Sequence, residues 1–256
     1  MYDRTKRVKL WLNLLFLLVI ISLCFFYLRV NPLHIISVTP SFVSYIASNF
    51  FPPSLNNFEA YLQVALYTIA FAVVGTYLSA ILSLFLGILM SEEIVKNRII
   101  RVTTRIVATF VRTIPVLILA SVMMFIFGIG SIGGLLALVL STTGFLSRSY
   151  ADSISDIASK KLESFRASGT PTLPLIIHGL IPELMPAWIN WTLFTFEISI
   201  RSSAVLGMVG AGGMGILIRT HLESRNFNEA ATLILVLIAV VLCTEFVTGI
   251  IRKRYL

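Results

Sequence analysis

The chain of 256 residues is too apolar and too sparsely charged for a soluble globular protein. Hydrophobic residues make up 57% of it and charged residues 12%, against roughly 45–50% and about 25% in soluble domains. The charges form clusters between long uncharged stretches, which is typical of a chain that crosses a membrane several times. The 20 Lys and Arg behind the net charge of +8 flank these stretches instead of forming one stripe, which argues against nucleic acid as a partner.

Six apolar stretches predict an all-α, polytopic membrane protein. A span needs about 20 apolar residues, and the basic lead before the first stretch is followed by too long an apolar region for a signal peptide. We expect one domain over 1–256, with the first span and an external loop in 1–59 and a core in 60–256. The expected spans cover roughly residues 10–28, 61–90, 106–127, 129–146, 186–200 and 231–251.

The distribution of basic residues predicts the orientation of these spans. Cytoplasmic segments carry an excess of Lys and Arg, and here fifteen basic residues fall on one side against four on the other, with Arg112 inside the membrane. Both termini are therefore expected in the cytoplasm of a cell membrane protein. The fifteen are Arg4, Lys6, Arg7, Lys9, Lys96, Arg98, Arg101, Arg105, Arg148, Lys160, Lys161, Arg166, Arg252, Lys253 and Arg254.

Four small residues recur at every fourth position of the second span, at Gly75, Ser79, Ser83 and Gly87. This spacing places them on one helix face, and small residues let membrane helices approach closely. The stripe predicts ordinary packing within the chain, with a dimer or gate surface as the alternative.

A glycine-rich segment follows the fifth span and matches the pattern GxGxxG, with Glu229 further on where a dinucleotide fold would place an acid. That fold needs a βαβ unit, whereas this segment follows a membrane span. We therefore expect a close-packed, bendable turn. The predicted gate or hinge residues are Pro115, Gly207, Gly210, Gly212, Gly213 and Gly215.

The chain carries no Walker A, HExxH or GxSxG motif, and His34, His178 and His221 are scattered. An enzyme would need a nucleophile, base or metal ligands gathered at one depth. We therefore expect no catalytic residue, metal or cofactor. An intramembrane enzyme and an ion channel remain the alternatives from other functional classes.

The predicted cytoplasmic loop 148–182 is polar enough to lie outside the bilayer and too patterned for a linker. Its apolar residues, among them Ile154, Ala158 and Phe165, predict short amphipathic helices across the membrane face. Such a helix can insert between the lobes of a partner protein.

The spacing of Glu163, Gly169 and Pro182 in this loop resembles the coupling signature of ATP-binding-cassette (ABC) importer permeases, EAA, three residues, G, nine residues, IxLP. Ser164 and Phe165 replace the two alanines, and Gly179 and Ile181 replace Ile and Leu. The resemblance implies contact with a cytoplasmic ATPase. The residues implied in this coupling are Glu163, Ser164, Phe165, Arg166, Ala167, Gly169 and Pro182.

The wider chain, from about Tyr61 to the C-terminus, is similar to phosphonate-type permeases. The segments that carry this similarity are 112–115, 143–145, 196–201 and 205–215. It implies a type I ABC importer permease fold, a dimer with a second copy or a paralogue, two cytoplasmic ATPases, an external substrate-binding protein and a phosphorus oxyanion as the solute. A permease for methionine or another small solute is the alternative within this class.

Ionisable residues inside spans suggest a substrate pathway, since each charge at the bilayer centre costs about 2.5–3.5 kcal/mol or more. The candidates are Arg112, Glu197 and Arg201, with Glu245 in the last span. Glu197 and Arg201 are four positions apart and can pair on one helix face. Arg112 has no acid at helical spacing in its own span, and its guanidinium matches two oxygens of an oxyanion at once.

Overall fold

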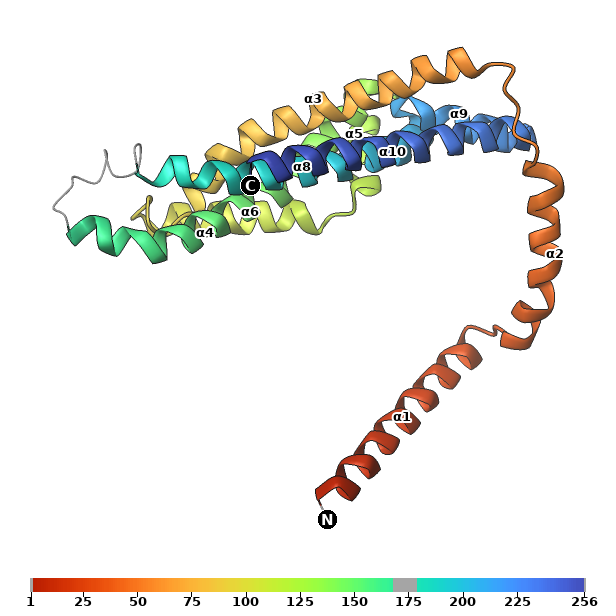
Figure 1. Cartoon of the computed structure of the whole chain (residues 1–256), viewed down its shortest axis with the longest axis horizontal. Helices are drawn as coiled ribbons and strands as arrows, with labels where there is room; N and C mark the ends of the chain where they lie inside the picture. Colours follow the sequence, from red (N-terminus) through yellow and green to blue (C-terminus); the bar gives the residue numbers. More distant parts are fainter. Residues whose placement is uncertain (1, 168–178, 256) are drawn as a thin grey trace. The chain divides into compact units, whose positions relative to one another are not determined.

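The computed structural model describes residues 2–167 and 179–255, with side chains for residue 6 and for residues 8–158 and 179–254. Contacts divide the chain into two units, Met1–Phe51 and Pro52–Leu256. The secondary structure of the described residues is helical throughout (Figure 1). This confirms the all-α fold class.

The first unit holds two helices, α1 (Tyr2–Tyr27) and α2 (Pro32–Phe50). Val8–Tyr27 of α1 is long and apolar enough to span a membrane. The sequence predicts a loop after this span, but residues Pro32–Phe50 form the helix α2, so this prediction is corrected. Asn31 caps it, because its side-chain oxygen accepts the backbone N–H of Leu33 at 3.0 Å, and Pro32 suits a first helical turn.

The second unit is a bundle of long helices with a short one at one end (Figure 1). Its helices are α3 (Phe58–Met90), α4 (Arg98–Thr113), α5 (Val116–Phe127), α6 (Ser131–Ala167), α8 (Ile181–Leu206), α9 (Met214–Glu223) and α10 (Phe227–Tyr255).

Five helices of the described chain could each cross a membrane, namely α1, α3, α6, α8 and α10, and α4 with α5 reaches this length only as a bent pair. Helices α3 and α6 run in the same direction, because Gly75 lies against Leu138 and Gly87 against Tyr150. The chain must therefore return between them. Helices α4 and α5 supply that crossing, which agrees with the six spans expected.

The contact between α3 and α6 uses the small-residue stripe of α3. Gly75, Ser79, Ser83 and Gly87 are all buried. The Ser79 hydroxyl lies 3.2 Å from the Val139 carbonyl oxygen and also bonds the Thr142 hydroxyl, and Ser83 donates to the Thr143 carbonyl at 3.3 Å. Small side chains let the backbones approach, and hydroxyls bridge them where water is absent. The interpretation as packing within the chain is confirmed.

Helix α6 continues well beyond its predicted span. Its 37 residues measure about 55 Å at 1.5 Å per residue, more than the roughly 30 Å of a hydrocarbon core. The prediction of separate short helices over 148–167 is therefore wrong for this part of the loop. Ile154 and Ala158, two of the apolar residues behind that prediction, extend the core of the bundle instead.

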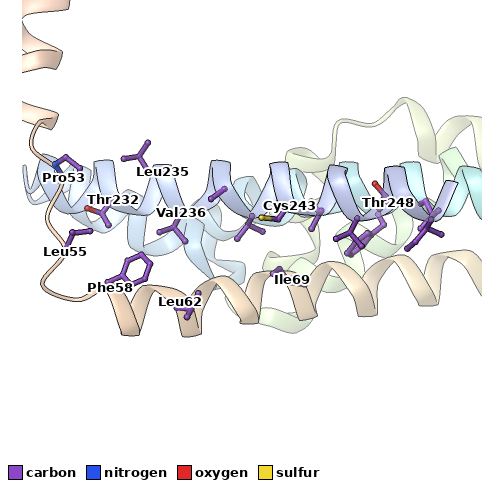
Figure 2. A pocket seen from close by; sticks show the side chains of 17 residues that line it. Pro53, Leu55, Phe58, Leu62, Ile69, Thr232, Leu235, Val236, Cys243 and Thr248 are labelled. Carbon is purple, nitrogen blue, oxygen red and sulfur yellow. The ribbon is translucent and has the colours of Figure 1, made fainter. Parts of the chain in front are cut away.

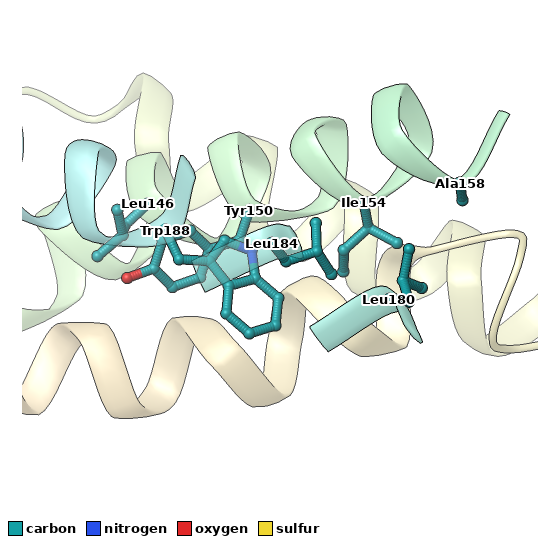
Figure 3. Packing of buried hydrophobic residues seen from close by; sticks show 7 residues of the cluster. All are labelled: Leu146, Tyr150, Ile154, Ala158, Leu180, Leu184 and Trp188. Atoms are coloured by element: carbon teal, nitrogen blue, oxygen red, sulfur yellow. The ribbon is translucent and has the colours of Figure 1, made fainter. Parts of the chain in front are cut away.

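The extension of α6 packs against the start of α8, which runs back alongside it (Figure 3). Tyr150 and Trp188 place their ring centroids 5.5 Å apart, and the Tyr150 and Thr192 hydroxyls are 2.5 Å apart. This cluster packs the extension of α6 against the first turns of α8. Its buried members are Leu146, Tyr150, Ile154, Ala158, Leu180, Leu184 and Trp188.

The tight α3–α6 contact predicts the effect of a single methyl group. A Cβ at Gly87 would lie 2.9 Å from the Tyr150 Cβ, whereas a Cβ at Gly249 of α10 would meet nothing within 4 Å. We expect Gly87→Ala to destabilise the protein by about 1–3 kcal/mol, because overpacking forces the helices apart. Gly249→Ala is the matched control and should keep or raise the thermal midpoint in detergent. Equal midpoints for the two variants would contradict this account of the contact.

Candidate functional site

A sharp break between α4 and α5 forms the first part of the candidate site. The two helices meet at 94°, and Pro115 is the residue before α5. Proline cannot donate a backbone hydrogen bond and keeps the residue before it out of helical geometry. Ile114 accordingly has an extended backbone, with φ −79° and ψ 123°. The predicted hinge at Pro115 thus coincides with a real break in the chain.

Arg112 occupies the last turn of α4, immediately before this break. The C-terminal end of a helix favours a cation. The guanidinium carbon lies 5.4 Å from the centre of the Phe145 ring of α6, a cation–π contact. Gly144 makes this close approach possible, because a Cβ there would lie 2.9 Å from the Arg112 backbone nitrogen.

Arg112 is exposed in the isolated chain, and none of the ion pairs among the described side chains involves it. Among the described side chains, the ion pairs of arginine involve Arg101, Arg148, Arg201, Arg219 and Arg252. Within the described part of the chain, the Phe145 ring face and the C-terminal end of α4 are therefore what balances the charge of Arg112. The guanidinium fork remains open to an anion.

The other two pathway candidates lie between α8 and α10, and the predicted Glu197–Arg201 pair is wrong. Glu197 instead accepts from Arg252 at 2.8 Å and from the Thr248 hydroxyl, and Arg201 pairs with Glu245. Helices α8 and α10 are antiparallel, so Glu197 and Arg201 each meet an opposite charge on α10. The spacing of Glu245 and Arg252, seven positions apart on one helix face, was the signal for this arrangement in the sequence.

The glycine-rich segment reverses the chain between α8 and α9. A π-helical turn, η2 (Gly207–Ala211), follows α8, and Gly210, Gly212 and Gly213 have φ values of 119°, 90° and 73°. These lie in the left-handed half of backbone space, which favours glycine. A Cβ at Gly215 would clash with the Ala204 carbonyl oxygen. The segment therefore closes on itself through backbone contacts that only glycine permits.

The start of α9 is tied to α3 by one hydrogen bond, from the Met214 backbone N–H to the Thr68 hydroxyl at 3.0 Å. Thr68 was not among the predicted residues. The GxGxxG pattern joins two helices and not a strand to a helix, so the geometry differs from a dinucleotide site. Within the described residues, no three His, Cys, Asp or Glu side chains come together to hold a metal ion.

The predicted coupling residues divide between the described and undescribed parts of the chain. Glu163, Ser164, Phe165, Arg166 and Ala167 belong to the last turns of α6, but their side chains are outside the described set. Gly169 lies outside the described residues altogether. Pro182 is exposed in the first turn of α8. The signature therefore begins at the end of one arm of the α6–α8 hairpin and finishes at the start of the other.

A large groove between α3 and α10 is a poor candidate for an anion site (Figure 2). It has a volume of about 690 Å³, and its lining is apolar apart from threonine hydroxyls and Cys243. An oxyanion placed there would lose its water without gaining hydrogen bonds. The groove suits an apolar neighbour.

Comparison with known proteins agrees with this geometry. Residues 83–256 match the family described as "Binding-protein-dependent transport system inner membrane component". The phosphite transport system permease protein PtxC of Stutzerimonas stutzeri is 24% identical over 93% of this chain and 86% of its own. The phosphate-import permease protein PhnE of Mycolicibacterium smegmatis is 32% identical over 90% of this chain, which spans only 43% of that protein.

The fold is shared with a solved transporter. The permease chain of the inward-facing MetNI methionine ABC transporter superposes with a TM-score of 0.69 and 22% identity, over 79% of this chain and 99% of that one. This chain belongs to the family of binding-protein-dependent inner membrane transport components. It is a multi-pass permease subunit of an ABC importer, a transport component and not an enzyme.

The ion pairs between α8 and α10 predict the behaviour of charge variants. Glu197→Gln leaves Arg252, whose side chain is 31% exposed, without its carboxylate. We expect a lower thermal midpoint. The loss of unfolding free energy should be smaller than the roughly 3–5 kcal/mol that breaking a fully buried ion pair costs, because Arg252 is partly exposed. The swap of Glu197→Arg with Arg252→Glu should recover part of the loss. A swap variant no more stable than Glu197→Gln would mean that the pair contributes little.

Proposed function

We propose that this permease carries a phosphorus oxyanion, such as an organophosphonate, phosphite or a phosphate ester, into the cell. The observation that carries the proposal is the guanidinium of Arg112, which stands at the α4–α5 break with no carboxylate partner among the described side chains. The names of two relatives that align with at least 90% of this chain, which refer to phosphite and phosphate, also support it.

Arg112 suits such a solute for chemical reasons. A guanidinium presents two parallel N–H groups to two oxygens of a phosphonate or phosphate, whereas an ammonium offers a point charge. An arginine already paired with a carboxylate would have to be freed first. In this proposal Arg112 contacts the anion during transport. Glu197 and Arg201 lie beside the path and are held in place by their ion pairs with α10.

The proposed assembly contains two permease chains, two cytoplasmic ATPases and an external binding protein, with both termini of the permease in the cytoplasm. The positions of basic residues in the second unit support this orientation. Lys96, Arg101, Arg148 and Arg252 lie toward the end of the bundle where α3 and α10 finish, and cytoplasmic ends carry the excess of positive charge. The α6–α8 hairpin extends from the same end.

We further propose that ATP-driven closure of the ATPases acts on the segment from Glu163 to Gly169, which begins in the last turns of α6. The hairpin would transmit the movement to the bundle as a shift between two packings. The break at Pro115 and the turn at Gly207–Gly215 are the places where helices can change direction without breaking regular hydrogen bonds. A methionine permease remains the alternative, since the fold is shared with MetNI.

Arg112→Lys tests the anion path. We expect slower uptake of phosphonate or phosphite with unchanged assembly of the complex, because lysine keeps the charge and loses the fork. Arg105→Lys, seven positions earlier on the same helix face, is the matched control and should transport normally. The measurement is uptake by proteoliposomes with limiting ligand on the binding protein, across a panel that includes methionine. Equal uptake by Arg112→Lys and wild type would remove Arg112 from the path, and uptake of methionine alone would replace the proposed solute.

Gly169→Leu tests the coupling. If Gly169 permits a turn or a close backbone approach, a bulky side chain should abolish stimulation of the ATPase by the ligand-loaded binding protein. The membrane domain should still insert, and its thermal midpoint without the ATPase should be unchanged. Normal ligand-stimulated hydrolysis in this variant would show that the spacing match in the loop is accidental.

A further inference from the structure

Helix α2 (Pro32–Phe50) belongs to neither the spans nor the coupling end, and none of its residues is buried. We propose that α2 lies flat in the membrane–water interface, at the face of the bilayer where α1 ends, with its apolar side among the upper acyl chains. The partner of this surface is therefore the uncharged boundary between headgroups and hydrocarbon of the protein's own membrane. This proposal does not depend on the transported solute.

The sequence of α2 separates into two faces at 100° per residue. Four serines at positions 37, 41, 44 and 48 follow one line along the helix, with His34 beside them. The opposite face carries mainly large apolar residues, with Thr39 and, in the last turn, Asn49 as its polar members. The apolar residues with the greatest exposure include Ile36 at 69%, Phe42 at 60% and Val43 at 59%. An apolar face of this size in water would be an aggregation liability.

The polar atoms of α2 are suited to a partly dry environment, because many of their donors are satisfied within the helix. Ser37 donates to the His34 carbonyl at 2.9 Å and Ser48 to the Tyr45 carbonyl at 3.2 Å. Thr39, the one hydroxyl on the apolar side, donates to the Ile35 carbonyl at 2.8 Å. An unsatisfied hydroxyl costs free energy away from water. These bonds reduce the cost of placing α2 at the edge of the hydrocarbon.

The position of α2 in the chain places it at the bilayer surface. The spans on either side end at Tyr27 and begin at Phe58, so the connection leaves and re-enters the same face of the membrane. Between Arg29 and Glu59 there is no Lys, Arg, Asp or Glu. A segment without charges has no electrostatic reason to stay in bulk water. Although α2 has 19 residues, it contains no stretch apolar enough to place it among the helices that could cross a membrane, which favours a helix in the interface over one that crosses.

The lack of cations also identifies the kind of membrane contact. Interfacial helices rich in Lys and Arg depend on anionic lipids, whereas α2 can bind only through apolar burial. Its immersion should therefore be the same in zwitterionic and in anionic bilayers. This separates the proposal from an electrostatic membrane anchor.

Nitroxide accessibility tests the proposal in the full transporter in phosphatidylcholine nanodiscs. Cys24 and Cys243 are first replaced by serine. Single nitroxides are then attached through Ile35→Cys, Phe42→Cys and Ile46→Cys on the apolar face, and through Ser37→Cys, Ser41→Cys and Ser48→Cys on the polar face. Collision with oxygen, which concentrates in acyl chains, is compared with collision with a water-soluble nickel complex. Ala72→Cys, a buried site, and Glu223→Cys, in an exposed helix turn, are the references.

We expect the oxygen-to-nickel ratio to oscillate with a period of about 3.6 residues, with maxima at the apolar positions and no change when phosphatidylglycerol replaces phosphatidylcholine. A flat ratio with high nickel access would place α2 in water, and low access to both quenchers throughout would place it against protein. A high ratio on every face would make it a span. Each of these three results, or a dependence on anionic lipid, would overturn the proposal.

Discussion

The close contact between α3 and α6 is the constraint on which the rest of the second unit depends. Lipid tails are as apolar as leucine side chains, so membrane helices associate through packing and hydrogen bonds and not through hydrophobicity. Glycines and serines at every fourth position of α3 supply both. Because the two helices run in the same direction, the chain between them has to return across the bundle. That return produces the broken α4–α5 crossing and so the position of Arg112.

The break and the arginine form one arrangement. Pro115 ends regular hydrogen bonding between the two helices, Gly144 lets α4 approach α6, and Phe145 offers its ring to the guanidinium. The result is a cation at a discontinuity in a span, which in membrane proteins marks a pathway or a partner. Arg201 and Glu197 are different, because their opposite charges on α10 neutralise them and hold two antiparallel helices in register.

The two ends of the second unit differ in how their helices are connected and packed. At one end, α6 and α8 extend as a hairpin with a continuous apolar core, which suits a lever that carries movement between a partner and the bundle. At the other, the glycine turn between α8 and α9 packs backbone against backbone and is tied to α3 through Thr68. A well-packed α6–α8 hairpin can transmit a movement, and the glycine turn lets the chain change direction between α8 and α9. Both features are consistent with an importer that alternates between two packings.

The sequence by itself determined the fold class, the approximate positions of the spans and the family, because apolar length, charge distribution and motif spacing are local properties of the chain. It also determined that the Gly75–Gly87 stripe packs against a neighbour and that Pro115 and the glycine segment interrupt helices. Only the tertiary structure decided which residues meet. Glu197 and Arg201 satisfied the four-residue spacing of an ion pair, yet α10 offered each a better partner across the helix interface. Likewise, the apolar pattern that starts at residue 148 belongs equally to a separate surface helix or to a continuation of the preceding helix, and the contacts of Tyr150, Ile154 and Ala158 with α8 made it a continuation of α6. Helix α2 was missed because its proline and serines are typical of loops, whereas its cap and its own side-chain hydrogen bonds stabilise a helix.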